Sequence, residues 1–265
     1  MIVLSLFDGM SCGQIALERA SMPVSKYLAS EIDSFAIRVT QANYPQTIQI
    51  GHVSDIKYSE LPKIDLLIGG SPCQGFSSAG YHQAFDDPRS ELFYEFSWML
   101  EEVQPKYFLL ENVVMKQEYQ DVITEELGVE PIKINSALVS AQNRVRLYWT
   151  NIPNSGQPKD KEIFLEDIIE GNIEHPLIQQ RGHGYNPGGV KAIEGKVPTL
   201  TSSGWQHNNH LILDDLSYRM FTPVECERLQ TVPDNYTCTV IATERYKMLR
   251  SCWTVDVIAH ILRNI

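Results

Sequence analysis

The sequence predicts an open α/β fold, in which strands of one sheet alternate with helices, together with a second, smaller domain. Three observations predict it. The chain begins with an apolar strand, a glycine turn and a helix, which is the opening unit of many nucleotide-binding folds. Further short apolar runs end in glycines or carboxylates, as strands do at the binding edge of such sheets. A long loop-rich segment then interrupts the pattern before a final helix.

Length and composition limit the class of protein. The chain has 265 residues, 43% of them hydrophobic, which is enough for one large domain with a substantial core. Its apolar runs are far shorter than the ~18 residues needed to cross a membrane, and the N-terminus lacks the basic flank of a signal peptide. The five cysteines include no C-x-x-C pair and the seven histidines lack ligand spacing, which indicates a reducing cytoplasm without disulfides or a metal site. The net charge of −11, taken alone, argues against a nucleic-acid partner.

The first strand, turn and helix occupy residues 2–6, 7–13 and 14–20, and a second helix is expected over 34–43. The glycine spacing in the turn is not G-x-G-x-x-G, so a dinucleotide pyrophosphate site is not indicated. Taken alone, the turn is equally typical of any tight connection between a strand and a helix.

Two acidic residues follow the next expected strands. A strand over 27–30 ends at Glu31, 22 residues after Gly9, and a strand over 48–53 leads to Asp55. An acid at this distance from a glycine turn can accept hydrogen bonds from ribose hydroxyls, and Asp55 suits an adenine amino group. A solvated helix cap is the alternative for Glu31. Together the two acids predict a pocket for an adenosine-type ligand without phosphates.

A cysteine follows the strand expected over 64–68, which ends in two glycines. Cys73 lies in the segment Ser71-Pro72-Cys73-Gln74-Gly75-Phe76-Ser77, at the carboxyl end of a strand, where chemistry is located in open α/β folds. A structural cysteine would more often lie inside the strand as a small hydrophobe. The local sequence leaves two interpretations open, a catalytic nucleophile and an ordinary loop cysteine. The polar, turn-rich residues 78–89 are expected to form a lid over Cys73 or a plain surface loop.

Charged residues also follow the later strands. After an amphipathic helix over 91–103 and a strand over 107–110, Glu111 is expected at the same sheet edge. Burial there would raise its pKa and suit it to proton donation. Arg144 and Arg146 alternate in a later strand, so they are expected on one face, where they converge on one site or line an exposed basic edge.

Residues 153–213 differ from the rest of the chain. They are loop-rich, and their part from 171 to 213 is neutral to basic. This part carries four of the seven histidines and interleaves Tyr185 and Trp205 with amide and hydroxyl side chains. This composition predicts a small polar recognition module for nucleic acid. A plain excursion loop is the alternative, although so long a segment usually has a function. A capping box at Thr222-Pro223-Val224-Glu225 then begins a helix, and a last helix over 255–262 returns the chain to the main core.

Taken in order, these residues resemble the motif series of the cytosine-5 DNA methyltransferases. The matching segments are Phe7-Asp8-Gly9 with Gly13, Pro72-Cys73-Gln74, Arg89-Ser90-Glu91-Leu92-Phe93, Glu111-Asn112-Val113, Gln142-x-Arg144-x-Arg146 and Arg219-x-x-Thr222-Pro223-x-Glu225-x-x-Arg228-Leu229-Gln230. The resemblance covers nearly the whole chain and implies a Rossmann-like class I methyltransferase sheet with helices on both faces, plus a small target-recognition domain. The expected catalytic and cofactor domain spans 1–155 and is completed by 240–265, and the expected target-recognition domain spans 156–239.

The resemblance also implies a reaction. The chain would transfer the methyl group of S-adenosylmethionine to carbon 5 of a cytosine flipped out of a short duplex DNA target, leaving S-adenosylhomocysteine. Cys73 would add to carbon 6 of the base and so activate carbon 5. Glu111 would hydrogen-bond the ring nitrogen and the amino group. Arg144 and Arg146 would bind the base carbonyl or a flanking phosphate and lower the pKa of Cys73.

The same resemblance implies binding residues and partners. The expected cofactor contacts are Phe7, Asp8, Gly9, Met10, Glu31, Ile32, Asp55, Ile56, Pro72, Leu92, Ser251 and Trp253. The DNA contacts expected from their chemistry are Gln74, Ser77, Arg181, Lys191, Gln206, Asn208 and Asn209. Double-stranded DNA and a cognate restriction endonuclease are the expected partners, without a metal or a membrane, in the cytoplasm of a bacterial or phage-infected cell.

One segment departs from the family pattern, and three other classes of protein are considered. Arg250 stands where family members usually carry glycine, which would alter the packing beside the cofactor and lower cofactor affinity. A cytosine-5 RNA methyltransferase acting on transfer RNA would carry the same motifs. A non-catalytic DNA-binding relative would keep the fold, but it would not need Cys73 and Glu111. A nicotinamide oxidoreductase is disfavoured because the G-x-G-x-x-G motif is missing.

Overall fold

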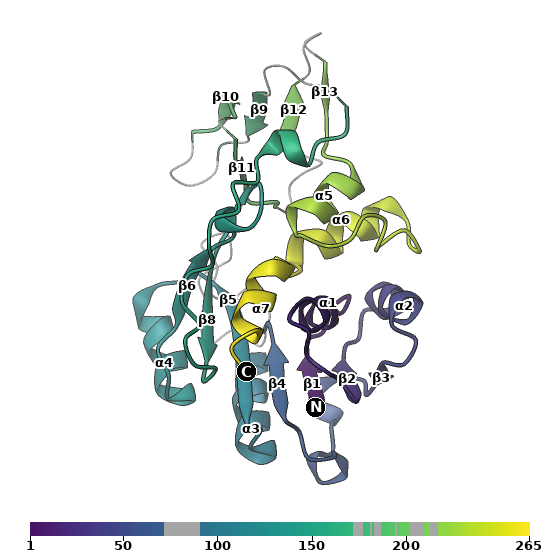
Figure 1. The fold of residues 1–265 in the computed structure, drawn as a ribbon, viewed down its shortest axis with the longest axis vertical. Coiled ribbons are helices and arrows are strands. Elements are labelled where there is room, and N and C mark those ends of the chain that lie inside the picture. The colour runs from purple at the N-terminus through teal and green to yellow at the C-terminus, as the bar shows by residue number, and fades with distance from the viewer. Residues whose placement is uncertain are drawn as a thin grey trace. The chain divides into compact units, whose positions relative to one another are not determined.

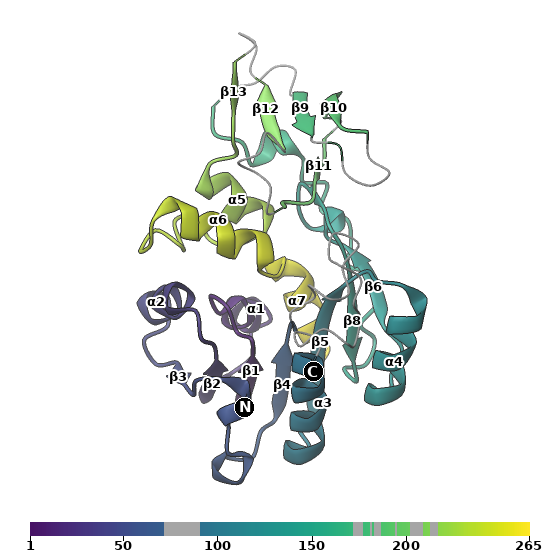
Figure 2. The same cartoon turned by 180° about the vertical axis from the view of Figure 1, so that it is seen from behind.

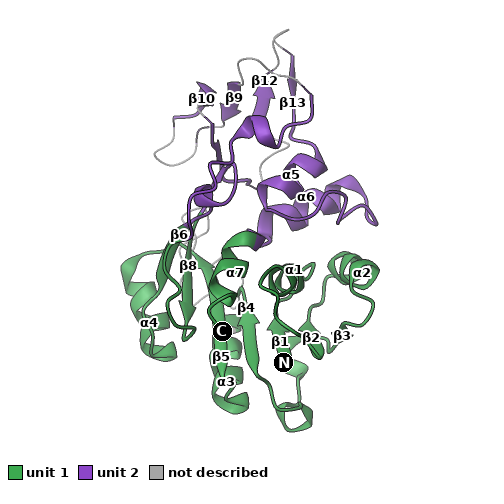
Figure 3. Ribbon diagram, viewed as in Figure 1, with its two compact units in different colours: residues 1–134, 145–157, 256–265 green, residues 135–144, 158–255 purple. Residues whose placement is uncertain are grey.

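The computed structural model describes residues 1–71, 91–171, 177–180, 182, 187–193, 195–201, 209–212 and 217–265, with only the backbone of Glu91. These residues form two compact units (Figure 3). The first unit comprises 1–134, 145–157 and 256–265, and the second comprises 135–144 and 158–255.

The first unit is built on a seven-stranded sheet with the order β3-β2-β1-β4-β5-β8-β6 (Figures 1 and 2). Its strands are β1 (Ile2–Leu6), β2 (Lys26–Ser30), β3 (Ile48–Gln49), β4 (Leu66–Gly69), β5 (Tyr107–Val113), β6 (Ile132–Asn135) and β8 (Val145–Thr150). The five strands β1 to β5 pair in parallel, and β8 is antiparallel to β5. Because the strand order reverses between β1 and β4, their carboxyl ends flank the crevice in which sheets of this type bind ligands.

Helices cover both faces of this sheet. The elements are α1 (Cys12–Arg19), α2 (Ser34–Asn43), α3 (Glu91–Val103), α4 (Gln117–Leu127) and α7 (Val255–Leu262), with 3-10 turns η1 (Val53–Asp55) and η2 (Tyr58–Glu60). One core cluster joins Leu4 and Leu110 of the strands to buried side chains of α3 and α4. Val3 and Leu109 are equally buried, but as neighbours in the strands they point to the other face. The predicted α/β sheet with helices on both faces is therefore confirmed.

The carboxyl ends of two strands lie several residues from the predicted positions. β3 stops at Gln49, whereas the predicted strand runs to residue 53, because Gly51 takes a left-handed φ of +81° and a 3-10 turn carries Asp55. β5 continues beyond the predicted end at residue 110, because β8 pairs with it as far as Val113. Glu111 therefore lies inside a strand and not after one.

The second unit contains a four-stranded antiparallel sheet and two helices. The sheet has the order β10-β9-β12-β13, and a separate parallel pair joins β7 to β11. The elements are η4 (Ser136–Leu138), β7 (Gln142–Asn143), η5 (Leu165–Asp167), β9 (Leu177–Gln180), β10 (Gly189–Ala192), β11 (Val197–Pro198), β12 (His210–Ile212), β13 (Tyr218–Arg219), α5 (Pro223–Leu229) and α6 (Ala242–Ser251). Strands this short show no period in a sequence, which is why the sequence predicts a loop-rich segment here.

Helix α5 begins as predicted, whereas α6 is a helix that the sequence pattern does not predict. The capping box is formed, since the Thr222 hydroxyl accepts a hydrogen bond from the Glu225 N–H at 3.1 Å and the Glu225 carboxylate accepts one from the Thr222 N–H at 2.7 Å. Glu225 is fully buried and pairs with Arg219 at 2.7 Å. α6 buries only Met248 and Leu249 among its residues, so its apolar face is too narrow to give a clear helical period.

The boundaries of the two units differ from the domain boundaries expected from the sequence, which place the second domain at 156–239. Residues 135–144 and 240–255 belong to the second unit, because hydrogen bonds hold them there. The Val255 N–H donates to the Gln230 carbonyl at 3.0 Å, and the Arg144 guanidinium donates to two carbonyls at the end of α6. The chain therefore returns to the first unit only with α7.

Candidate active site

The turn after β1 has a left-handed backbone at alternate residues. Phe7, Gly9 and Ser11 have φ values of +55°, +60° and +60°. Such a conformation is strained for residues other than glycine and is maintained only by surrounding contacts. The Asp8 N–H donates to the Ser30 carbonyl at 3.1 Å, which ties the turn to the end of β2. A Cβ built on Gly9 would meet no described atom within 4 Å, so the described residues leave space beside Gly9.

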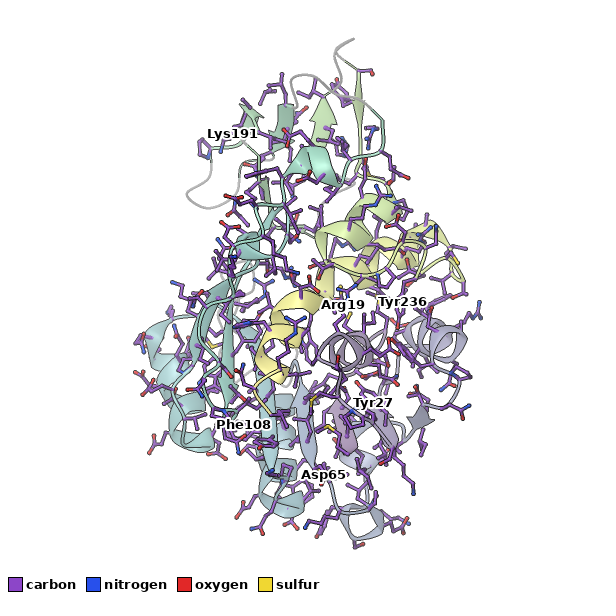
Figure 4. The ribbon with its side chains drawn as sticks, viewed as in Figure 1. Arg19, Tyr27, Asp65, Phe108, Lys191 and Tyr236 are labelled. Atoms are coloured by element: carbon purple, nitrogen blue, oxygen red, sulfur yellow. The ribbon has the colours of Figure 1, made fainter. Side chains whose placement is uncertain are left out.

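The Asp8 carboxylate lies within this turn. It accepts hydrogen bonds from the Tyr27 hydroxyl at 2.7 Å and from the Ser11 hydroxyl; Tyr27 is labelled in Figure 4. Burial raises the pKa of Asp8 to about 6 against the lowering effect of these hydrogen bonds, and the charge of Glu31 raises that pKa slightly further. The Asp8 side chain, which is expected at the cofactor, is thus engaged within the turn itself.

Glu31 joins the end of β2 to the same turn. Its Oε2 accepts a hydrogen bond from the Gly9 N–H at 2.7 Å, and its Oε1 accepts from the N–H groups of Ile32 and Asp33 at 2.7 and 2.8 Å. The acid and the glycine turn therefore meet at one sheet edge. Ile32 is 69% exposed and presents an apolar surface beside the carboxylate.

The other expected cofactor residues differ in exposure. Asp55 is exposed at η1, whereas the side chains of Met10 and Ile56 are buried and Leu92 on α3 is partly buried. Two further expected contacts belong to the second unit: Ser251 and Trp253.

The charges and donors at this sheet edge fit S-adenosylmethionine. Asp8, Glu31 and Asp55 make the edge acidic, which suits a cationic sulfonium better than the phosphates of a nucleotide. Glu31 offers carboxylate oxygens to hydroxyl groups, and Ile32 offers an apolar surface to a planar base. These residues would hold a nucleoside that carries a positive charge and no phosphate.

Glu111 and Arg146 form an ion pair between β5 and β8. The Glu111 Oε1 and the Arg146 Nε are 3.0 Å apart, and both side chains are largely buried, with 11% and 15% exposed. The pairing of the strands sets Val113 opposite Arg146. Glu111 and Arg146 are therefore diagonal neighbours, within reach of long side chains on one face.

Asn112 connects this strand to the residue that precedes the cysteine segment. Its Nδ2 donates to the Ser71 Oγ at 3.1 Å, and its Oδ1 accepts from the Val113 N–H at 2.8 Å. Ser71 is buried at the end of β4 and is the last described residue before Cys73. Asn112 is a candidate functional residue that the sequence reasoning does not identify, although its place directly after Glu111 is a signal that could have done so.

Arg144 and Arg146 have different partners. Arg144 stands between β7 and β8, is 3% exposed, and donates from its guanidinium to the carbonyls of Arg250 and Cys252 at 3.2 and 3.0 Å. The expected alternation along one strand does not occur, because Arg144 interrupts the two strands. Arg250, which departs from the family pattern, lies on α6, and burial lowers its pKa.

The residues expected to read DNA are mostly outside the described part of the chain. Outside it lie Gln74, Ser77, Arg181, Gln206 and Asn208, together with Pro72 and Cys73. Lys191 is exposed on β10 (Figure 4), and its ammonium donates to the Gln180 Oε1 at 3.3 Å. Asn209 is buried, and its amide bonds the Thr199 carbonyl and the Gln180 side chain. Asn209 thus connects three segments of the second unit through hydrogen bonds.

The described residues offer neither a cluster of metal ligands nor a membrane-spanning helix. Within the described ranges, no group of three or more His, Cys, Asp or Glu side chains is arranged to hold a metal ion. In the same part of the chain, no helix is long and apolar enough to cross a membrane.

The chain is similar to known methyltransferase sequences. A family model described as C-5 cytosine-specific DNA methylase matches residues 1–164 and 115–265. The type II methyltransferase M.NlaX of Neisseria lactamica is 27% identical over 298 residues, which cover 99% of this chain and 95% of that protein. The orphan methyltransferase M.Rho11sI of Bacillus phage rho11s is 36% identical over 183 residues, which cover 64% of this chain and 34% of the phage protein.

Solved structures share the fold. The Entamoeba histolytica methyltransferase EhMeth superposes with a TM-score of 0.78 at 16% identity, over 98% of this chain and 96% of that one. The Dnmt2 methyltransferase of S. pombe superposes with a TM-score of 0.65 at 17% identity, over the same two fractions. At these identities the superpositions show that the chains share an architecture.

Proposed function

The chain belongs to the C-5 cytosine-specific DNA methylase family, and we propose that it acts through a covalent adduct between Cys73 and carbon 6 of the target cytosine. It is a DNA methyltransferase that transfers the methyl group of S-adenosylmethionine to carbon 5 of cytosine and leaves S-adenosylhomocysteine. The observation that carries the proposed mechanism is the Glu111–Arg146 pair. The bond between Asn112 and Ser71 links that pair to the strand end that leads to Cys73.

Cys73 supplies the nucleophile in this proposal. Carbon 5 of cytosine is a poor nucleophile, and addition of the Cys73 thiolate to carbon 6 makes carbon 5 enamine-like. The cofactor would supply an electrophilic methyl group: as carbon 5 forms its bond to the methyl carbon, the bond from that carbon to the sulfonium sulfur breaks and S-adenosylhomocysteine leaves. Loss of the carbon 5 proton and breakage of the bond from sulfur to carbon 6 then restore the ring and the thiolate. A cytosine inside a duplex must leave the base stack before Cys73 can reach it.

Glu111 and Arg146 bind the base in this proposal. The Glu111 carboxyl hydrogen-bonds the ring nitrogen and the amino group, which stabilises the adduct as charge develops. Arg146 orients that carboxyl through the contact of its Nε at 3.0 Å. Its Nη1 donates to the Val145 carbonyl at 2.8 Å, and we assign its Nη2 to the base carbonyl. We assign Arg144 to the backbone at the end of α6 instead of the base, because its guanidinium is bonded to two carbonyls there.

The carboxyl ends of the first strands bind the cofactor in this proposal. Glu31 accepts hydrogen bonds from the ribose hydroxyls, in line with its place beside the Gly9 turn. Ile32 packs against the adenine, and the exposed Asp55 accepts from the adenine amino group. These roles use an acidic edge that suits the positive charge of the cofactor.

The similar methyltransferases suggest the substrate, the protein partner and the place of action of this chain. We propose duplex DNA with a short target sequence as the substrate, read by the second unit. A cognate restriction endonuclease is the proposed protein partner, since relatives include type II methyltransferases. The proposed place of action is the cytoplasm of a bacterial or phage-infected cell, in line with the bacterial and phage sources of the relatives.

The experiment is nucleoside mass spectrometry of unmodified duplex DNA after incubation with the protein and S-adenosylmethionine. Wild type and Cys238→Ala should yield 5-methylcytosine, because Cys238 is an exposed cysteine of the second unit. Cys73→Ala should yield none and should still bind DNA in a gel-shift assay. Substantial methylation by Cys73→Ala would refute the covalent mechanism. A parallel reaction with transfer RNA tests the substrate, and 5-methylcytosine in RNA alone would overturn the DNA assignment.

A further inference from the structure

A buried tyrosine hydroxyl supports the turn after β1. Tyr27 lies on β2 (Figure 4) and is 3% exposed, and its hydroxyl donates to the Asp8 Oδ1 at 2.7 Å. Asp8 belongs to the turn, so this bond joins the second strand to the segment that follows the first. A hydrogen bond to a carboxylate is stronger than one between neutral groups, and a buried carboxylate that loses a donor is left poorly solvated.

The same carboxylate is bonded to the residue that precedes α1. The Ser11 hydroxyl donates to the Asp8 Oδ2, and the Thr40 hydroxyl of α2 lies 3.2 Å from the Ser11 Oγ. Ser11 is the left-handed N-cap residue of α1, with φ +60° and ψ +41°, and its side chain makes no capping bond to the helix. Its hydroxyl is instead directed to Asp8. Asp8 therefore joins β2, the turn and the start of α1.

These bonds determine the orientation of the Gly9 peptide. Gly9 lies between two left-handed residues, Phe7 and Ser11, and its N–H donates to the Glu31 Oε2 at 2.7 Å. The left-handed conformations persist only while surrounding contacts hold them. Without the anchor at Asp8, relaxation of the turn would rotate the Gly9 N–H away from the carboxylate that is proposed to bind the ribose.

We propose that Tyr27 is a positioning residue for the cofactor, which acts through Asp8 to hold the Gly9 turn and Glu31 in their binding geometry. The inference rests on the cofactor site of the proposed function. It gives Asp8 the role of a link between Tyr27 and the turn, in place of a direct contact with the cofactor. Neither residue touches the reacting atoms.

The test compares two substitutions that each remove one hydroxyl. Tyr27→Phe removes the bond to Asp8, whereas Tyr44→Phe removes a bond to Glu18 at 2.9 Å, at the opposite end of α1 from the turn. Both tyrosines line one cavity of about 260 Å³, and each donates its hydroxyl to a carboxylate. The dissociation constant of S-adenosylhomocysteine is measured by calorimetry without DNA, and kcat and KM are measured with S-adenosylmethionine.

Tyr27→Phe should weaken binding of S-adenosylhomocysteine about fivefold and raise KM to a similar extent, with kcat at saturating cofactor within about twofold. Tyr44→Phe should leave both constants within about twofold. An unchanged dissociation constant in Tyr27→Phe, or the same loss in both variants, would overturn the inference. A fall in kcat with unchanged binding would also overturn it, because that result places Tyr27 in the chemical step.

A double-mutant cycle separates this role from a general loosening of the fold. If Tyr27 acts through Asp8, the double variant Tyr27→Phe with Asp8→Ala, which has no side-chain acceptor, should bind no more weakly than Asp8→Ala alone. Additive losses would overturn the inference. Asp8→Leu, which also removes the acceptor of the Tyr27 hydroxyl, replaces Asp8→Ala in the cycle if that variant does not fold. Wild type that binds S-adenosylhomocysteine but methylates no nucleic acid would refute the proposed function alone, whereas wild type that does not bind it would refute the site on which this inference rests.

Discussion

Replacing Asp8 with Asn should change how the stability of the protein depends on pH between about pH 4 and about pH 7. Burial raises the pKa of the Asp8 carboxyl from 3.8 to about 6. Between these two values the folded chain holds a proton that the unfolded chain has released, so the free energy of unfolding falls as pH rises. The loss is absent below the unfolded pKa and complete above the folded pKa. The Asn side chain does not titrate, so the variant lacks this loss.

The size of the effect follows from the shift in the pKa. A change from 3.8 to about 6 corresponds to about 3 kcal/mol if all of it acts on folding. Asp8 is only partly buried as a residue, so solvent screening should reduce the effect to about 1–2 kcal/mol. The hydroxyls of Ser11 and Tyr27 oppose the effect, because they donate to the ionised carboxylate, and their opposition is already contained in the folded pKa.

Urea unfolding of the wild type and of Asp8→Asn, followed by tryptophan fluorescence from about pH 4 to about pH 7.5, measures this effect. The quantity of interest is the difference between the two proteins at each pH, in which the titration of the other carboxylates cancels. Relative to the wild type, Asp8→Asn should gain about 1–2 kcal/mol of stability as pH rises through this range. The conclusion that Asp8 is a buried acid with a raised pKa would be refuted by a stability difference that is constant with pH. It would also be refuted if the variant lost stability relative to the wild type as pH rises.

Two further substitutions test contacts inside each unit, Gly69→Ala in the first and Arg144→Gln in the second. Gly69→Ala in β4 should lower the free energy of unfolding by about 1–3 kcal/mol, because the new Cβ would lie 2.9 Å from the Phe96 ring. Gly156→Ala is the control, since its Cβ would meet no described atom within 4 Å; it should stay within about 1 kcal/mol of wild type, and equal losses in the two variants would contradict this account. Arg144→Gln should cost about 2–4 kcal/mol, because two carbonyls at the end of α6 lose a buried cationic donor. A melting temperature equal to that of the wild type would show that the guanidinium does not hold those carbonyls.

Motifs in the sequence predicted that Gly9 and Glu31 lie at the same edge of the sheet. Gly9 and Glu31 are 22 residues apart, and they meet in a hydrogen bond of 2.7 Å, because parallel strands of an open α/β sheet end at the same edge. The capping box of Thr222 and Glu225 is formed as predicted, since both of its partners lie within one helical turn. Such features depend on residues close in sequence, or on a topology that α/β sheets share.

Contacts between distant segments could not be predicted in this way. Arg144 and Arg146 are two residues apart, yet Arg144 bonds carbonyls 106 and 108 residues further along the chain, while Arg146 pairs with Glu111. Because the chain leaves strand conformation at Arg144, between β7 and β8, the two arginine side chains point to different partners. The local sequence pattern does not predict this break. The bond between Asp8 and Tyr27 could not be predicted for the same reason, because it depends on how β1 and β2 pair.

The sequence by itself determined most strands and helices of the first unit, the acid Glu31 at the end of β2 and the cysteine that follows β4. The tertiary structure decided which of the charged side chains face one another and which are bonded to backbone carbonyls. The physical reason is that the periodicity of apolar residues records which face of an element is buried. The partner of a buried polar group is instead whichever complementary group the packing brings within hydrogen-bonding distance.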